Sequence, residues 1–196
     1  MRMFVAVLPP EEVLEDLDEF LGPRREAGRE LRWATREQWH VTLAFMAAVP
    51  ERSLDDLIER LARAARKRTP FTARLGGGGA FPDAARAKVL YAGVRADDPE
   101  ELRRLAVGAR AAATKAGAEV GGGRFRPHLT LARSGRTFEA TRWLRVLDAY
   151  QGPAWVADNV VLVESRLGEG PRGRPRYAVV SELPLGKRPE MQATLR

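Results

Sequence analysis

Short apolar runs alternate along the chain with longer segments in which apolar residues recur at helical spacing. The first run covers residues 4–8, and after Pro9-Pro10 the apolar residues from Val13 to Leu21 follow the period of an amphipathic helix. Ser53 and Asp98-Pro99 are start signals for further helices, so helices are predicted over residues 11–21, 54–67, 99–116 and 139–150. Strands are predicted over residues 4–8, 31–34, 38–47, 71–75, 88–94, 125–133, 155–166 and 176–183.

The order of these elements is similar in the two halves of the chain. Each half contains a histidine-bearing strand with a helix on either side and further strands after it, so the halves look like degenerate copies. A mixed order with hairpin-like links favours an α+β fold with antiparallel sheets over a parallel doubly wound sheet. We therefore predict one domain over residues 1–196, made of two pseudo-symmetric lobes whose antiparallel sheets are flanked by helices.

The two histidines of the chain stand in the same local frame. His40 lies in QWHVTLAF and His128 in RPHLTLAR, so both begin the pattern His-apolar-Thr-Leu-Ala. With nine Thr and 22 Leu among 196 residues, a random His has this Thr and Leu placement with a probability of roughly one in two hundred. The repetition is therefore a signal, whether structural or chemical.

Strand alternation predicts where the first of these motifs points. Side chains alternate across a strand, so one face carries His40 and Thr42 and the other carries Val41, Leu43 and Phe45. The apolar set is typical of a core face. The polar set is expected to face water, a ligand or the other lobe.

The second motif repeats this alternation, with His128 and Thr130 opposite Leu129 and Leu131. A lone His or Thr on a strand is usually structural. Two matched pairs in matching halves favour chemistry instead, because a pseudo-two-fold arrangement would bring four polar groups to one cleft between the lobes.

Such a cleft suits the opening of a cyclic phosphodiester by water. One proton must leave the nucleophile and another must reach the leaving oxygen, and two imidazoles with an ordinary pKa of about 6.5 can divide these tasks. Thr hydroxyls can donate hydrogen bonds to the phosphate oxygens. Two His without Cys or an evident carboxylate cluster make a poor metal site, so neither a metal nor another cofactor is expected.

Composition places the chain among globular proteins, with 44% hydrophobic and 30% charged residues. The absence of cysteine excludes disulfides, cysteine zinc sites and a cysteine nucleophile. The N-terminus lacks the features of a signal peptide, and no run approaches the roughly 18 apolar residues of a membrane span. A soluble, cytoplasmic, monomeric protein without membrane contact is expected.

The net charge of +7 and the pI of about 10.5 permit a polyanionic partner such as RNA. However, 29 of the 33 basic residues are Arg and the chain is rich in Ala and Gly, which a GC-biased coding sequence would also produce. Charge alone leaves both interpretations open.

The motifs and their flanks resemble a known family. HVTL at 40–43 and HLTL at 128–131 look like the paired H-x-T-φ signature of the 2H phosphoesterase superfamily. Within it the chain is most similar to the RNA 2′,3′-cyclic phosphodiesterase family, historically called 2′-5′ RNA ligases. The segments that carry this similarity span nearly the whole chain: RMFVAVLPPE, LRWATREQWHVTLAF, GGGGAFPDAARAKVLYAGV, FRPHLTLAR and LVESRLGEGPRGRPRYAVVSELPL.

The resemblance implies a bilobal α+β fold with the active site between the lobes and metal-independent hydrolysis of 2′,3′-cyclic phosphate ends of RNA or nucleotides to 2′-phosphates. Reversible 2′-5′ RNA ligation is an implied side activity. His40 would be the general acid and His128 the general base, although a symmetric site leaves the reverse assignment open. Thr42 and Thr130 would bind the phosphate.

Arg133 matches the Arg that closes the family's second motif and would add positive charge for the phosphate. Strict alternation puts Arg133 on the face opposite His128, so this role requires the strand to end or bulge before Ser134-Gly135. The first motif departs from the family pattern, which usually continues with a basic residue where this chain has Ala44. By alternation Ala44 shares the His40 face, which would leave that face without a basic group.

Other features of the sequence have a structural explanation as well as a functional one. The glycines at 76–79 and 121–123 lack the Lys-Ser/Thr of a P-loop and are predicted to be loops or bulges. A turn between the last strands carries arginines that would track an RNA backbone or simply be solvated: Arg166, Arg172, Arg174 and Arg176. Three aromatic residues would stack a terminal base or be buried: Trp33, Trp39 and Phe4.

Two alternative functions stay open at this point. One is a 2H phosphoesterase that acts on another cyclic phosphate or trims RNA 3′ ends. The other is a basic RNA-binding or phosphate-binding module without catalysis, in which the His-Thr pairs merely hold phosphate.

Overall fold

The computed structural model describes residues 1–186, and the last ten residues of the predicted domain, 187–196, lie outside the described residues. The helices are α1 (Glu11–Leu21), α2 (Leu54–Arg66), α3 (Pro99–Lys115) and α4 (Thr141–Asp148). The strands are β1 (Met3–Val7), β2 (Arg32–Trp33), β3 (Val41–Ala48), β4 (Phe71–Phe81), β5 (Ala87–Ala96), β6 (Glu119–Val120), β7 (His128–Phe138), β8 (Gln151–Ala157), β9 (Asn159–Arg166) and β10 (Arg176–Pro184).

All strands of residues 1–186 join one antiparallel sheet. This confirms the predicted α+β class. The separate sheets expected for the two lobes are instead one continuous sheet. The order is β10-β9-β1-β3-β7-β5-β4-β8, with β6 paired to β3 and β2 paired to β7. The sheet is narrowest in its middle, where β3 and β7 share the registered pair Val41 and Leu129. The two histidine motifs thus occupy neighbouring strands at the junction of the lobes.

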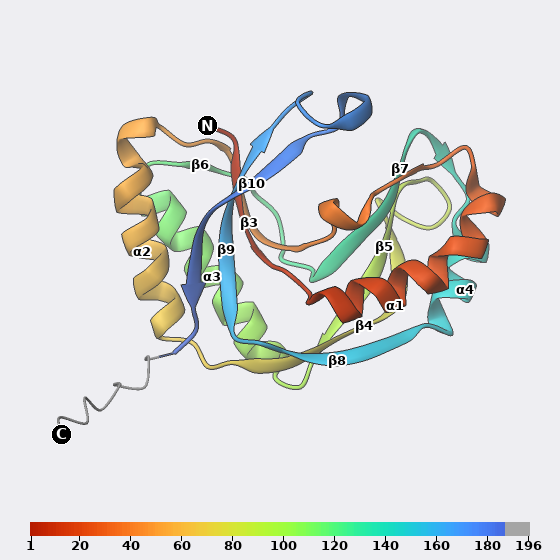
Figure 1. Ribbon diagram of the computed structural model, residues 1–196, viewed down its shortest axis with the longest axis horizontal. Helices are drawn as coiled ribbons and strands as arrows, with labels where there is room; N and C mark the ends of the chain where they lie inside the picture. Colours follow the sequence, from red (N-terminus) through yellow and green to blue (C-terminus); the bar gives the residue numbers. More distant parts are fainter. Residues whose placement is uncertain (187–196) are drawn as a thin grey trace, which may run out of the picture.

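Each lobe takes elements from both halves of the chain. One lobe contains β1, β3, β9 and β10 with α2 and α3, and the other contains β4, β5, β7 and β8 with α1 and α4 (Figure 1). The N-terminal strand β1 therefore lies in one lobe while the helix that follows it packs beside β8 in the other. The resemblance between the halves is expressed in the motifs rather than in lobes made of consecutive sequence.

The helices follow the predicted limits closely, whereas several strands do not. Asp98 caps α3 by accepting a hydrogen bond from the Glu101 amide at 3.0 Å, but Ser53 makes no side-chain cap at the start of α2. The predicted strand over residues 155–166 is two strands, β8 and β9. The glycines at 76–79, predicted to form a loop or a bulge, lie within the long strand β4, whose register with β5 shifts between Leu75 and Gly78, so the bulge is the alternative that the structure confirms.

The core fixes the two motif strands from behind. Val41, Leu43, Leu129 and Leu131 are each at most 3% exposed, as alternation predicted for them. Burying a side chain of this size stabilises the fold by about 2 kcal/mol. The polar residues of each motif consequently lie on the opposite face of the sheet.

Candidate active site

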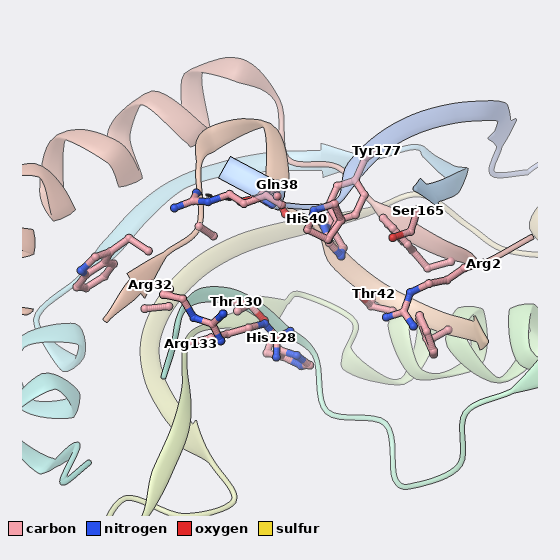
Figure 2. Close-up of a pocket in the computed structure, with 18 of the residues that line it drawn as sticks. Arg2, Arg32, Gln38, His40, Thr42, His128, Thr130, Arg133, Ser165 and Tyr177 are labelled. Atoms are coloured by element: carbon pink, nitrogen blue, oxygen red, sulfur yellow. Dashed lines mark hydrogen bonds between the residues drawn. The ribbon is translucent and has the colours of Figure 1, made fainter. Parts of the chain in front are cut away.

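A cavity of about 560 Å³ lies where β3 and β7 meet, and both His-Thr pairs line it. His40 and Thr42 come from the β3 side, and His128 and Thr130 come from β7 (Figure 2). The structure therefore brings together the four residues that sequence periodicity placed on one cleft.

A matching β-bulge in each motif strand decides which later side chains enter the cavity. Val5 and Ala6 of β1 face Ala44 and Thr42, so Leu43 is an extra residue in β3. An extra residue shifts the alternation by one position beyond the bulge. Ala44 is accordingly buried in the core, and Phe45 lines the cavity; both placements correct the prediction from strict alternation.

The second bulge repeats this geometry in β7. Leu90 and Tyr91 of β5 face Ala132 and Thr130, which leaves Leu131 as the extra residue. Leu131 and the next residue are both buried, and Arg133 turns to the same side as His128. Arg133 therefore lines the cavity, and the bulge that its predicted role required is present two residues before it.

Backbone carbonyl groups fix the tautomer and orientation of both imidazoles. The Nδ1 of His40 lies 2.8 Å from the carbonyl oxygen of Gln38, and the Nδ1 of His128 lies 2.7 Å from that of Arg126. A carbonyl oxygen only accepts hydrogen bonds, so Nδ1 must carry the proton in each ring. The neutral rings consequently keep Nε2 as a free acceptor. The two carbonyl partners of Nδ1 could not be predicted from the sequence.

Aromatic side chains enclose the His40 ring. The Phe4 ring stacks on it with centroids 4.4 Å apart, and the Tyr177 ring meets it edge-on at 5.4 Å. This burial lowers the pKa of His40 to about 4, against a smaller raising effect from the hydrogen bond to Gln38, and the positive charges of His128 and Arg133 lower it further. His40 is therefore neutral at pH 7 in the free protein.

The His128 ring has a comparable but more open surrounding. The Phe81 ring meets it edge-on with centroids 5.0 Å apart, and the Tyr91 ring is tilted at 5.3 Å. Burial lowers the pKa of His128 below its usual value, the hydrogen bond to Arg126 opposes this, and the charge of Arg133 adds to the lowering. Both imidazoles are thus available as bases, and His40 is the harder of the two to protonate.

The glycine run of β4 makes room for this aromatic setting. Gly79 faces Tyr91 across the sheet, and a Cβ at Gly79 would overlap the Tyr91 ring. A Cβ at Gly78 would similarly overlap Leu147 of α4. The glycines therefore serve close packing behind His128 within a bulged strand.

The cavity wall is strongly basic. Among residues 1–186, five arginines line it and no Asp or Glu does: Arg2, Arg32, Arg133, Arg172 and Arg174. Within residues 1–186 none of these five guanidinium groups forms an ion pair with a carboxylate, whereas Arg36 outside the cavity contacts Glu11, Glu15 and Asp18. Uncompensated positive charge in a concave site favours an anionic ligand.

The arginines of the turn between β9 and β10 lie in different surroundings. Arg172 and Arg174 line the cavity and also a neighbouring cavity of about 640 Å³, and Arg176 lines only the latter. Arg174 donates a hydrogen bond to the side-chain oxygen of Gln38 at 3.3 Å. Arg166 instead pairs with Glu164 at 2.9 Å and lines neither cavity.

The three aromatic residues considered for base stacking lie in different surroundings. Trp39 is buried at 3% exposure, and Phe4 is buried at 4% with its ring on His40. Trp33 lines the cavity and donates its indole N–H to the Gly28 carbonyl oxygen at 2.8 Å.

Arg2 lines the cavity as well but was not predicted from the sequence, although alternation along RMFVAV places it on the same face as Phe4.

The depressed histidine pKa makes stability depend on pH. An unfolded chain has His40 at about 6.5, above its folded value of about 4, so the unfolded state binds more protons between these values. The free energy of unfolding is therefore expected to fall as pH falls from 7 to 5, by at most about 2 kcal/mol from this group. Urea unfolding of the protein and of His40→Gln at pH 7 and pH 5 measures this change in the free energy of unfolding. Equal pH dependence in the two proteins would contradict the prediction.

Two further observations concern residues 1–186. No helix in this range is long and apolar enough to cross a membrane. Across the same part of the chain, no three or more His, Cys, Asp or Glu side chains gather as the ligands of a metal ion would.

Comparison with known proteins agrees with this geometry. The sequence model of the 2′-5′ RNA ligase superfamily matches residues 9–169. The chain is similar to the protein named RNA 2′,3′-cyclic phosphodiesterase of Thermus thermophilus, with 36% identity over 94% of this chain and 90% of the relative. It is also similar to the protein of that name from Aquifex aeolicus, with 30% identity over 79% of this chain and 82% of the relative.

A solved structure shows the same fold. The crystal structure of a Thermus thermophilus protein has a TM-score of 0.76 and 32% sequence identity, covering 96% of this chain and 100% of its own. These matches confirm the resemblance predicted from the paired motifs: the chain belongs to the 2′-5′ RNA ligase superfamily.

Proposed function

We propose that this protein hydrolyses the 2′,3′-cyclic phosphate ends of RNA or nucleotides to 2′-phosphates by acid-base catalysis with its two histidines and without a metal. The observation that carries the proposal is the pair of imidazoles with free Nε2 atoms on one cavity that, in the described part of the chain, is lined by arginines without ion pairs and by no carboxylate. The names of the Thermus and Aquifex relatives support the same reaction class.

The reaction needs only groups that line the cavity, besides water. One imidazole Nε2 removes a proton from water as its oxygen attacks phosphorus, and the P–O3′ bond breaks. The other imidazole, protonated beforehand, gives its proton to O3′ and leaves a 2′-phosphate. The resemblance assigns His40 as the acid and His128 as the base, so His40, which is the harder to protonate in the free protein, must gain its proton when the substrate binds. Thr42 and Thr130 donate hydrogen bonds to the phosphate oxygens.

The anionic substrate supplies the protonation that the free protein lacks. Burial keeps both imidazoles neutral near pH 7 in the free protein. A phosphate anion beside them favours the charged imidazolium and raises their pKa. Binding of the substrate and protonation of the acid are therefore coupled.

The proposal predicts turnover in the presence of EDTA. Incubation with 2′,3′-cyclic nucleotides and with an oligoribonucleotide that ends in a cyclic phosphate is expected to yield only 2′-phosphates, resolved from 3′-phosphates by chromatography. The same incubation with a 5′-hydroxyl RNA tests reversible 2′-5′ joining.

Each alternative function has its own outcome in this assay. Binding of RNA without turnover would identify a non-catalytic module. A 3′-phosphate product would retain the enzyme and overturn the proposed leaving group, whereas progressive shortening of the oligonucleotide would indicate trimming of RNA 3′ ends. Loss of turnover in EDTA that is restored by a divalent cation would contradict the metal-independent mechanism.

A further inference from the structure

The two bulged motifs differ at one equivalent position that faces the cavity. Five residues after the histidine, the bulge turns Arg133 into the cavity on the β7 side and Phe45 on the β3 side. The β7 side therefore presents a guanidinium where the β3 side presents an aromatic ring. A pseudo-symmetric phosphate site would lack a cation on one side if Phe45 stood alone.

Arg2 brings a guanidinium to this ring from the neighbouring strand. Its Cζ lies 4.4 Å from the centroid of the Phe45 ring, in the range of a cation-π contact. The Arg2 backbone is held beside β9, because its carbonyl oxygen accepts a hydrogen bond from the Ser165 amide at 2.8 Å. Alternation with Phe4 then directs the Arg2 side chain to the cavity face.

No carboxylate of the described residues neutralises the charge of Arg2. Arg2 lines the cavity and forms no ion pair within residues 1–186. Figure 2 shows it on the Thr42 side of the cavity, with Arg133 on the Thr130 side. Both guanidiniums also act on one group: burial raises the pKa of Tyr177, and the charges of Arg133 and Arg2 oppose that rise.

We propose that Arg2 is a substrate-binding residue that contacts the substrate phosphate from the Thr42 side, as the counterpart of Arg133, with Phe45 as its platform. This inference rests on the proposed function and adds a residue to its site. A cyclic phosphodiester spreads one negative charge over two non-bridging oxygens, and the 2′-phosphate product carries more. Cations on opposite sides can bind both oxygens.

The first test compares Arg2→Gln with Arg166→Gln, a matched control on a nearby strand that lines neither cavity. Calorimetric titration with adenosine 2′-monophosphate and with inorganic phosphate measures binding, and kcat/KM is measured for a 2′,3′-cyclic nucleotide. Loss of a charge-assisted hydrogen bond is expected to weaken binding and lower kcat/KM about 10- to 100-fold in Arg2→Gln. The control is expected to stay within about twofold of the parent protein.

The second test moves the charge to the pseudo-symmetric position. Because Phe45 has the backbone setting that Arg133 has on β7, Arg2→Gln/Phe45→Arg is expected to recover most of the phosphate binding. Phe45→Leu keeps an apolar residue but removes the ring, and is expected to weaken binding a few-fold, about the worth of an exposed cation-π contact. Should the double variant unfold, Arg2→Lys takes its place and is expected to retain more binding than Arg2→Gln.

The outcomes separate this inference from the proposed function. Turnover in the parent protein, with Arg2→Gln equal to it in binding and in kcat/KM, would overturn the role of Arg2 and leave the function standing. Absence of turnover in the parent protein, with weaker phosphate binding in Arg2→Gln, would remove the function and keep Arg2 as a phosphate ligand. A folded double variant no better than Arg2→Gln would contradict the equivalence of Arg2 and Arg133.

Discussion

Replacement of His40 or His128 by alanine is expected to lower kcat for a 2′,3′-cyclic nucleotide about 10²- to 10⁴-fold, the usual contribution of one acid-base group. Each imidazole presents its only free nitrogen to the cavity, and within residues 1–186 the chain has no third histidine to replace it. Combining both substitutions is expected to lower the rate by less than the product of the two effects, because acid and base act in one step.

Asparagine variants are the matched control for these alanine variants. An asparagine amide can still donate to the carbonyl of Gln38 or Arg126, yet it has no group at the position of Nε2. His40→Asn and His128→Asn are therefore expected to lose as much activity as the alanine variants while unfolding closer to the parent protein. Near-parental activity of either variant would refute the two-histidine mechanism.

The residual activities also assign the two roles. A variant without the base loses the fall in rate at low pH, and a variant without the acid loses the fall at high pH. With His128 as base, the profile of His128→Ala is expected to be flat on its acidic side. A flat acidic side in His40→Ala instead would exchange the two assignments.

The sequence predicted the helices and the pairing of the motifs well, because these depend on local signals. Pro10-Glu11 and Asp98-Pro99 mark helix starts that neighbouring strands do not alter. The His and Thr residues precede the bulges, so simple alternation places them correctly. Their meeting in one cavity followed from the repeat alone.

The predictions that failed depend on partner strands. A bulge is defined by the residues opposite it, and neither β1 nor β5 can be assigned as the partner from the motifs themselves. Alternation therefore misplaced Ala44 and Phe45. The bulge predicted for the glycines of β4 is present, but their packing role was not predictable for a related reason, since the space that they provide is filled by Tyr91 and Leu147 from other elements.

Replacement of Arg133 by glutamine is expected to lower kcat/KM about 10²-fold, comparable to the loss of one preorganised donor at a developing anion. Its positive charge also lowers the pKa of both histidines in the free protein. Removing that charge makes protonation easier, so the pKa of His128 and His40 is expected to rise in Arg133→Gln. Titration of the imidazole C–H signals by NMR measures this directly.

Two further variants separate the charge of Arg133 from its geometry. Arg133→Lys keeps the charge but not the two-pronged guanidinium, so it is expected to leave the histidine pKa values nearly unchanged while still losing phosphate binding. Arg136→Gln changes a charge on the same strand outside the cavity and is expected to alter neither quantity. Unchanged activity and unchanged histidine titration in Arg133→Gln would mean that the bulge at Leu131 serves packing alone. A fall in activity together with a rise in pKa requires the Arg133 charge to act inside the cavity, which alternation without the bulge does not allow.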